Sequence, residues 1–306
     1  MDESDDNAGF QGSSKPVKAT RKRRLSDYTH ILILIPVVAW VLIFLFVPLL
    51  IIFLNSFYTY TGIGVSHVFT LSNYMTVFTT PVYVHLIAYT LEVSTLIVLI
   101  TLVIGFPAAY YLAIKVQDEN KRLLLILVLI IPFWIDVTTK LMAWFPILGT
   151  DGMVNYALKS LGIIQGPIRG LLLSPQAAIF VMIQTYVLFM IAPILLSLAT
   201  MDLNLPRAAE TLGASPFQTF RHVILPLARP GIIIGSVFVF VATLGDFVTP
   251  SMLGGTMETA GLVIAQQAGV LNWPLASAIS VILVAITVAV VVVMFRSVKI
   301  ARMVFE

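Results

Sequence analysis

Four ionisable side chains interrupt long apolar stretches of this sequence: Glu92, Asp136, Lys140 and Asp246. An ionised side chain inside hydrocarbon or a protein core costs several kcal/mol, so each of them needs a partner or water. Asp136 and Lys140 stand four residues apart, and a mutual ion pair on one helix face is one explanation for them. Glu92 and Asp246 have no cationic neighbour in the sequence. A water-filled cavity, another helix or a cationic substrate would stabilise them.

These side chains give a predicted substrate pathway, in which Asp246 is the leading residue and a helix-packing hydrogen bond is its alternative role. Tyr186 and Gln184 are weaker candidates for a polar lining of the same pathway. Trp134 stands near a predicted helix end, where an interfacial anchor is its simpler interpretation. The full predicted set is Asp246, Asp136, Glu92, Lys140, Trp134, Tyr186 and Gln184.

Residues for enzyme chemistry are missing from the sequence. It has no His-Glu-x-x-His zinc helix, no Gly-x-Ser-x-Gly elbow, no Gly-x-x-x-x-Gly-Lys phosphate loop and no cysteine. The 4 histidines are scattered without the spacing of metal ligands. A net charge of +3 offers no broad basic surface for nucleic acid. We therefore expect no catalytic residue, no metal site and no hydrolysis of ATP by this chain.

The elements that position these residues follow from composition. Apolar side chains make up 59% of the 306 residues and charged ones only 11%, too few to coat a soluble globule. A helix needs about 20 apolar residues to cross the bilayer core. We predict an all-α integral membrane protein, and the six predicted spans are 31–54, 86–114, 123–145, 176–199, 231–253 and 274–295.

The N-terminal region predicts a retained first helix behind a disordered tail, residues 1–26, followed by a membrane domain over residues 27–306. The first apolar run is too long for a secretory signal and has no small-residue cleavage site. Basic residues near helix ends tend to stay in the cytoplasm. They predict cytoplasmic termini and external loops at 55–85, 146–175 and 254–273. The basic residues behind this orientation are Lys15, Lys18, Arg21 to Arg24, Lys115, Lys121, Arg122, Arg207, Arg221, Arg229, Arg296, Lys299 and Arg302.

A long cytoplasmic loop at residues 200–230 predicts two short helices with a hinge. Pro206 suits a helix start and Gly213 a helix stop. Ser215 is a predicted N-cap with Pro216 in the first helical position, and Pro226 is predicted to end the second helix. Phe217, Phe220 and Val223 form an apolar stripe that we expect to pack beneath the loop, which leaves residues 207–215 for contact with another protein.

This loop resembles the EAA coupling loop of ABC-importer permeases, through Ala208-Ala209, Gly213-Ala214-Ser215, Leu225-Pro226 and Pro230-Gly231. The resemblance implies the type I importer permease fold and contact with a cytoplasmic ATPase. The residues it assigns to that contact are Arg207, Ala208, Ala209, Glu210, Leu212, Gly213, Ala214 and Ser215. The family's leading Glu, six residues before the glycine, is Arg207 here, and Glu210 follows a turn later.

Two further stretches resemble the permeases of spermidine/putrescine-type importers: Pro132-Phe133-Trp134 and Gly245-Asp246-Phe247-Val248-Thr249-Pro250. The resemblance implies import of a small cationic solute such as a polyamine across the bacterial inner membrane by alternating access. It also implies a homologous second permease, two ATPase subunits that bind ATP and magnesium, and a periplasmic binding protein. An ion-coupled secondary transporter is the alternative, because it could use Glu92 and Asp246 as coupling sites.

Overall fold

The computed structural model describes residues 26–116, 118–202 and 204–296, with side chains described from residue 35 onward. Residues 1–25 of the predicted tail lie outside this range, as do the basic residues Lys299 and Arg302. The chain divides into two units, residues 1–50 and residues 51–306. The first unit contains most of helix α1 (Ser26–Asn55), with Pro36 and Pro48 inside it. The second unit holds all the other elements.

The second unit begins with a small cap formed by the predicted first external loop. It contains the antiparallel strands β1 (Thr59–Tyr60) and β2 (Val65–Ser66) and helix α2 (Ser72–Thr79). Buried Ser56 is hydrogen-bonded to the Tyr74 hydroxyl at 2.7 Å, and the Asn73 amide donates to the Ser56 carbonyl at 2.9 Å. These bonds fix the chain where it enters the rest of the unit.

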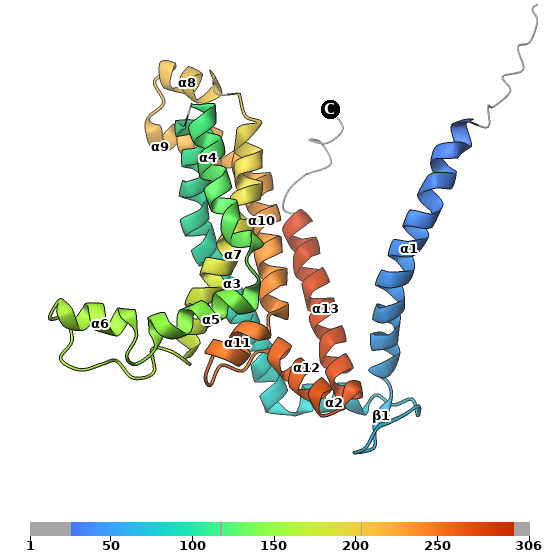
Figure 1. Cartoon of the computed structure of the whole chain (residues 1–306). Helices are drawn as coiled ribbons and strands as arrows, with labels where there is room; N and C mark the ends of the chain where they lie inside the picture. The colour runs from blue at the N-terminus through green and yellow to red at the C-terminus, as the bar shows by residue number, and fades with distance from the viewer. Residues whose placement is uncertain (1–25, 117, 203, 297–306) are drawn as a thin grey trace, which may run out of the picture. The chain divides into compact units, whose positions relative to one another are not determined.

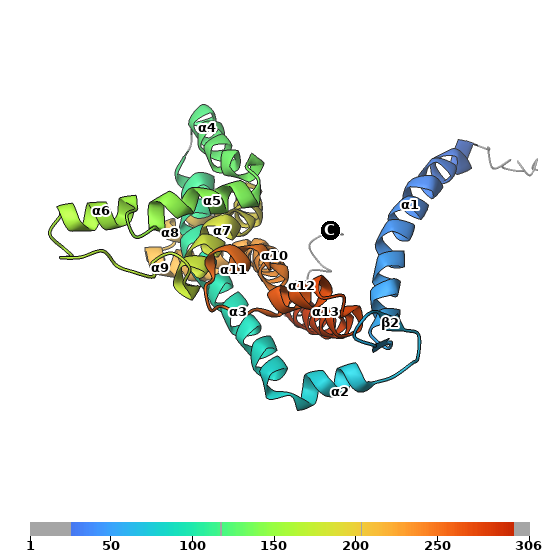
Figure 2. The same ribbon diagram turned by 60° about the horizontal axis from the view of Figure 1, so that its bottom comes forward.

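Three long helices form the core of the second unit: α3 (Pro81–Tyr110), α7 (Pro175–Ala199) and α10 (Leu225–Gly245). They lie side by side in both views (Figure 1, Figure 2). Small residues allow close approach of their backbones. A Cβ atom at Gly231 of α10 would lie 2.4 Å from the Pro193 carbonyl oxygen of α7, so a larger residue there would push the two helices apart. Helix α3 continues into a π-helical segment, η1 (Tyr111–Lys115).

Helices α12 (Ala260–Gly269) and α13 (Trp273–Arg296) pack against each other, and α13 also contacts α2 and α10. Their apolar cluster contains Val263, Leu275 and Ile279, with Val77 from α2. The buried Thr90 hydroxyl of α3 accepts a 2.8 Å hydrogen bond from the Ala260 backbone N–H. The last helix is thus fixed to the core through α12.

The predicted third span, 123–145, is wrong as one straight helix. Helix α4 (Glu119–Ile130) runs into a 3-10 turn, η2 (Ile131–Trp134), and the chain then bends by 92° into α5 (Val137–Leu148) and α6 (Met153–Ser160). Pro132 disrupts the helical hydrogen bonds, and Asp136 starts a new helix by capping α5. The apolar composition correctly predicts a membrane-spanning segment, but it does not reveal that Asp136 caps a new helix inside that segment.

The predicted boundaries of the fifth span are also corrected. Pro226 does not end a helix, because it lies in the first turn of α10, where a proline needs no N–H donor. The segments α9 (Pro216–Thr219) and η3 (Phe220–Ile224) therefore run directly into α10. At the other end, α10 stops at Gly245 and a separate short helix, α11 (Val248–Leu253), follows.

Five helices are long and apolar enough to cross a membrane, and the bent pair gives a sixth candidate. They are 35–55, 81–115, 175–199, 216–245 and 273–296, with 119–134 and 137–160 as the bent pair. The predicted set of six apolar elements is confirmed, with a break inside the third.

Candidate functional site

The predicted coupling loop folds into α8 (Asn204–Thr211), a glycine turn and α9, at one end of the bundle (Figure 1). Gly213 has φ +89, and its N–H donates to the Glu210 carbonyl while the Ala214 N–H donates to the Ala209 carbonyl, each at 3.0 Å. These two bonds make a Schellman C-cap, which satisfies carbonyls at the end of α8. The glycine is required for its backbone conformation, since a Cβ there would meet nothing within 4 Å.

Ser215 caps the second helix as predicted. The Gln218 N–H donates to the Ser215 hydroxyl at 3.3 Å, and the Ser215 N–H donates to the Gln218 side-chain oxygen at 2.8 Å. This reciprocal capping box satisfies two backbone N–H groups at the start of α9. Helix α9 continues through η3 into α10, so the α8–α9 unit is joined directly to a core helix.

The surface of the α8–α9 unit is mostly open to solvent. Leu212 is 88% exposed and Phe217 68% exposed, and the side chains of Arg207 and Glu210 are exposed as well. Ala209 and Ala214 are half-buried. The expectation that Phe217 packs beneath the loop is therefore wrong. Its neighbour Phe220 does pack inward, with its ring 5.6 Å from that of Phe106 on α3.

The second candidate site is the carboxylate of Asp246, at the junction of α10 and α11. Asp246 is 7% exposed, and although it falls inside the predicted span 231–253, it lies just beyond the end of α10 and not within a helix. The Tyr186 hydroxyl donates to its Oδ2 at 2.9 Å and the Thr249 hydroxyl to the same atom at 2.6 Å. The Thr249 backbone N–H donates to Oδ1 at 3.0 Å. Three donors thus stabilise a carboxylate that has no cation beside it among the described residues.

The structure brings Asp246 and Tyr186 together, but the other predicted pathway residues lie elsewhere. Asp136 Oδ2 accepts from the backbone N–H groups of Thr138 and Thr139 at 2.9 and 3.3 Å, so it is a helix cap. The proposed ion pair with Lys140 is wrong, because no salt bridge joins the Asp136 and Lys140 side chains in the described part of the chain.

The remaining three pathway candidates have exposed side chains. Glu92 is exposed on α3 and Gln184 on α7, and Trp134 is 85% exposed at the bend after α4. No hydrogen bond or ion pair in the described part of the chain joins these three to Asp246. They therefore do not form one cluster within this chain.

Sequence reasoning missed Thr249, which supplies two of the three donors to Asp246, although a threonine three residues after an aspartate is a capping signal. It also missed a cavity of about 570 Å³, with a mixed apolar and polar lining, between the starts of α3 and α7 and the loop before α12. His85, Tyr89, Thr256 and Glu258 supply its polar side chains. The start of α3 and the start of α12, which border the cavity, lie at the end of the bundle opposite α8 (Figure 1).

Comparison with known proteins places this arrangement among transport proteins, although no protein-family model matches the sequence. The chain is 34% identical over 254 residues to the spermidine/putrescine transport system permease protein PotB of Salmonella typhimurium, which covers 82% of this chain and 87% of that protein. PotB of Haemophilus influenzae is 33% identical over 265 residues, covering 85% and 91%. The inner membrane ABC transporter permease protein YdcU of Escherichia coli is 33% identical over 274 residues, covering 84% and 87%.

Among solved structures, a chain of a bacterial alginate ABC transporter in complex with an alginate pentasaccharide-bound periplasmic protein superposes with a TM-score of 0.74. It covers 90% of this chain and 96% of its own length at 18% sequence identity. A second alginate importer structure gives a TM-score of 0.69 at 20% identity. At such identities the superposition establishes the fold, which is that of an ABC importer permease.

Proposed function

This chain belongs to the spermidine/putrescine permeases of ABC importers and is a multi-pass inner-membrane permease subunit. We propose that its α8–Gly213–α9 unit is the element that contacts a separate ATPase. The observation that carries this proposal is the exposed, doubly capped unit at one end of the bundle, continuous with core helix α10. Membership of this family favours the importer over an ion-coupled secondary transporter.

The mechanical part of the proposal follows from the caps. ATP-driven closure of two ATPases would move α8. Because the Schellman turn and the capping box join α8 to α9 without a flexible linker, that movement would be transmitted to α10. Two permeases would then alternate between inward-facing and outward-facing states. Arg207 and Glu210 lie exposed on the contact surface, where Glu210 could serve in place of the acidic residue that the family has at position 207.

The complete importer would contain further subunits. We expect a homologous second permease, two ATPase subunits that carry ATP and magnesium, and a periplasmic binding protein. The permease would itself hydrolyse no ATP. From the basic residues we expect the α8–α9 side and both termini in the cytoplasm, so the cavity beside Glu258 would face the periplasm and the binding protein.

We propose a small cationic solute, with a polyamine as the leading candidate, because relatives over most of the chain are spermidine/putrescine permeases. The carboxylates of Glu258 at the outer cavity and of Asp246 near the α10–α11 junction would favour a cation. Titration of the cognate periplasmic binding protein with polyamines, other cationic solutes and zwitterionic amino acids tests this. Selective binding of a zwitterion would overturn the substrate assignment while leaving the importer assignment intact.

Co-purification tests the docking assignment. Leu212→Asp places a charge on an 88% exposed apolar side chain of the α8–α9 unit. We expect at least about a tenfold loss of co-purifying ATPase, as for a central interface residue, with normal insertion in the membrane. Ile63→Asp is the matched control, because Ile63 is an equally open apolar residue, 92% exposed, on the β1–β2 turn. Unchanged ATPase recovery with Leu212→Asp would contradict the docking assignment.

A further inference from the structure

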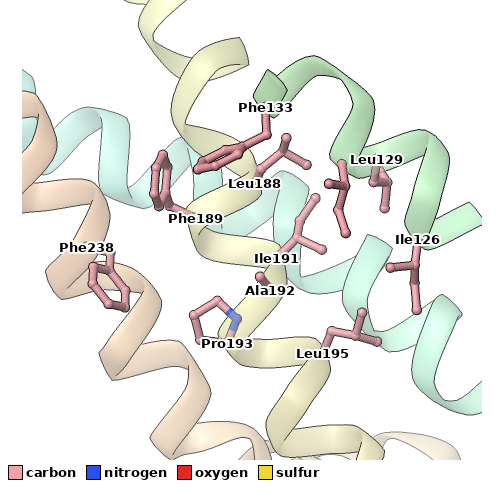
Figure 3. Close-up of a pocket in the computed structure, with 11 residues that line it drawn as sticks. Ile126, Leu129, Phe133, Leu188, Phe189, Ile191, Ala192, Pro193, Leu195 and Phe238 are labelled. Atoms are coloured by element: carbon pink, nitrogen blue, oxygen red, sulfur yellow. The ribbon is translucent and has the colours of Figure 1, made fainter. Parts of the chain in front are cut away.

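Two pockets of similar size border the core helices and differ in their lining. The pocket between α4, α7 and α10 is wholly apolar (Figure 3). The other, of about 390 Å³, lies between η1, at the end of α3, and the α8–α9 unit. Its wall includes the apolar side chains of Ile114 and Phe220, and Lys115, Arg207 and Glu210 supply its charges. An apolar wall with a few charged groups is typical of a site that receives an amphipathic group.

The wall of this second pocket also holds a polar group without a partner. Thr219 is 2% exposed, and its hydroxyl makes no hydrogen bond in the described part of the chain. By contrast, the Thr211 hydroxyl of α8 donates to the Arg207 carbonyl, four residues earlier, at 2.9 Å. Burial of an unpaired hydroxyl is unfavourable, so a polar group that enters the pocket and accepts from Thr219 would be stabilised there.

The charged side chains around this pocket have no partners either. No ion pair joins Lys115, Arg207 or Glu210 to another described side chain, and all three are exposed. Arg207 and Glu210 stand three residues apart on the same face of α8. With two cations and one carboxylate, the lining attracts a negatively charged group.

The lining favours a carboxylate on a protein side chain over a free inorganic anion. Lys115 and Arg207 would bind the carboxylate, and the methylene groups of an aspartate or glutamate would cover Ile114 and Phe220. An inorganic anion would leave that apolar wall uncovered. The pocket is also continuous with the proposed docking unit, because α8 and α9 form one side of it.

We propose that this pocket holds an acidic side chain of the ATPase, bound between Arg207 and Lys115, with the Thr219 hydroxyl as a further donor. This site extends the proposed contact between the α8–α9 unit and the ATPase, and it depends on that contact. Where the family's loop carries a glutamate, Arg207 reverses the charge that is offered to the partner. The pocket would therefore select the cognate ATPase and disfavour one that presents a basic side chain at the same place.

Removal of each cation tests the ionic part of the proposal. Arg207→Gln and Lys115→Gln are each expected to lower the amount of co-purifying ATPase about tenfold, because each leaves the acidic side chain without one partner. Arg221→Gln is the matched control and should keep the recovery of the parent chain, since Arg221 is an exposed arginine of η3 outside the lining. An equal loss with Arg221→Gln would indicate general attraction between charged surfaces and refute the pocket assignment.

The same assay separates this site from the docking assignment itself, because Leu212 does not line the pocket. If Leu212→Asp loses the ATPase while Arg207→Gln and Lys115→Gln retain it, the α8–α9 unit docks but the pocket holds no acidic side chain. If Leu212→Asp retains the ATPase as well, the docking assignment fails together with the pocket.

Thr219→Val tests the hydroxyl, because it keeps the size of the side chain and removes the unpaired donor. Thermal unfolding of the full chain in detergent should be unchanged or shifted to higher temperature. Co-purifying ATPase should fall about threefold, since the hydroxyl gains its acceptor only in the complex. Unchanged ATPase recovery, or a loss of recovery together with a lower unfolding temperature, would contradict the role assigned to Thr219.

Zero-length cross-linking identifies the acidic side chain. A carbodiimide joins an amine to a carboxylate in direct contact, so treatment of the assembled importer should link Lys115 to an aspartate or glutamate of the ATPase. Lys121, which is 76% exposed and pairs with Asp118 at 3.8 Å, is the control and should give no such link. Substitution of the linked residue by lysine should restore ATPase recovery in Arg207→Glu. Failure of Lys115 to link to the ATPase, including a link only to the second permease, or failure of the reversed pair to restore recovery, would overturn the proposal.

Discussion

At the scale of single residues, Gly213 is the position of the docking unit with the strictest backbone requirement. Its φ of +89 is unfavourable for a side chain by about 1–2 kcal/mol, although there is open space around it. We expect Gly213→Ala to loosen the α8–α9 turn and lower uptake relative to ATP hydrolysis. Gly213→Asn should be milder, because asparagine tolerates this conformation. Measuring both rates in proteoliposomes gives the coupling ratio.

The control for Gly213 is Gly162, which has φ +69 and equally open space in the loop after α6. Gly162→Ala carries a similar backbone cost outside the proposed contact with the ATPase, so its coupling ratio should equal that of the parent chain. A parental coupling ratio in Gly213→Ala, or an equal loss of coupling in the two variants, would show that the α8–α9 turn has no special role in coupling.

Asp246 has two possible roles that substitution can separate. Thr249→Val removes the 2.6 Å hydroxyl bond and keeps the charge, whereas Asp246→Asn removes the charge and keeps the side-chain shape. Both should lower stability by about 1–2 kcal/mol, measured by thermal unfolding in detergent. If Asp246 attracts a cationic solute, Asp246→Asn loses uptake at least about tenfold beyond Thr249→Val at equal protein amount. Equal uptake by the two variants would show that the Asp246 carboxylate has only a structural role.

At the scale of elements, both acidic residues of the predicted pathway that lie between helices serve as caps. Asp136 accepts from backbone N–H groups at the start of α5, and Asp246 accepts from that of Thr249 at the start of α11. These two carboxylates thus mark breaks in the spans, whereas Glu92 lies inside the continuous helix α3. An apolar window predicts that a span exists, but it averages over the cap and the proline that bend it.

The break at Asp136 gives a prediction about the bent pair. Asp136→Ala removes the α5 cap and should lower stability by about 1 kcal/mol, whereas Asp136→Ser should restore most of it. Lys140→Gln should leave stability unchanged, because no ion pair links it to Asp136 in the described residues. Thermal unfolding of the three variants in detergent measures the difference. Equal destabilisation by Lys140→Gln and Asp136→Ala would show that the two side chains do form an ion pair.

The sequence predicted the docking unit more completely than the substrate pathway, for a physical reason. Gly213 and Ser215 act through local backbone geometry, and their signals lie within a few residues of each other. The contact between Asp246 and Tyr186 joins positions 60 residues apart, and only the packing of α7 against α10 creates it. Phe217 was misassigned because helical spacing gives the face of a side chain but not what lies opposite that face.

At the scale of the whole molecule, orientation in the membrane connects the separate proposals. The outer cavity can receive solute from a periplasmic protein, and the α8–α9 unit can reach a cytoplasmic ATPase, only if they lie on opposite sides of the bilayer. Helix α8 lies at one end of the bundle, and the starts of α3 and α12, which border the cavity, lie at the other (Figure 1). The distribution of basic residues then predicts which end is cytoplasmic.

Single cysteines test this orientation directly, since the chain has none of its own. Leu212→Cys on the docking unit and Ile63→Cys on the β1–β2 turn are both highly exposed, at 88% and 92% for the native side chains. A membrane-impermeant maleimide added to intact spheroplasts should label Ile63→Cys and spare Leu212→Cys. Inside-out vesicles should give the reverse. Labelling of Leu212→Cys in intact spheroplasts would invert the topology, and the α8–α9 unit would then face away from any cytoplasmic ATPase.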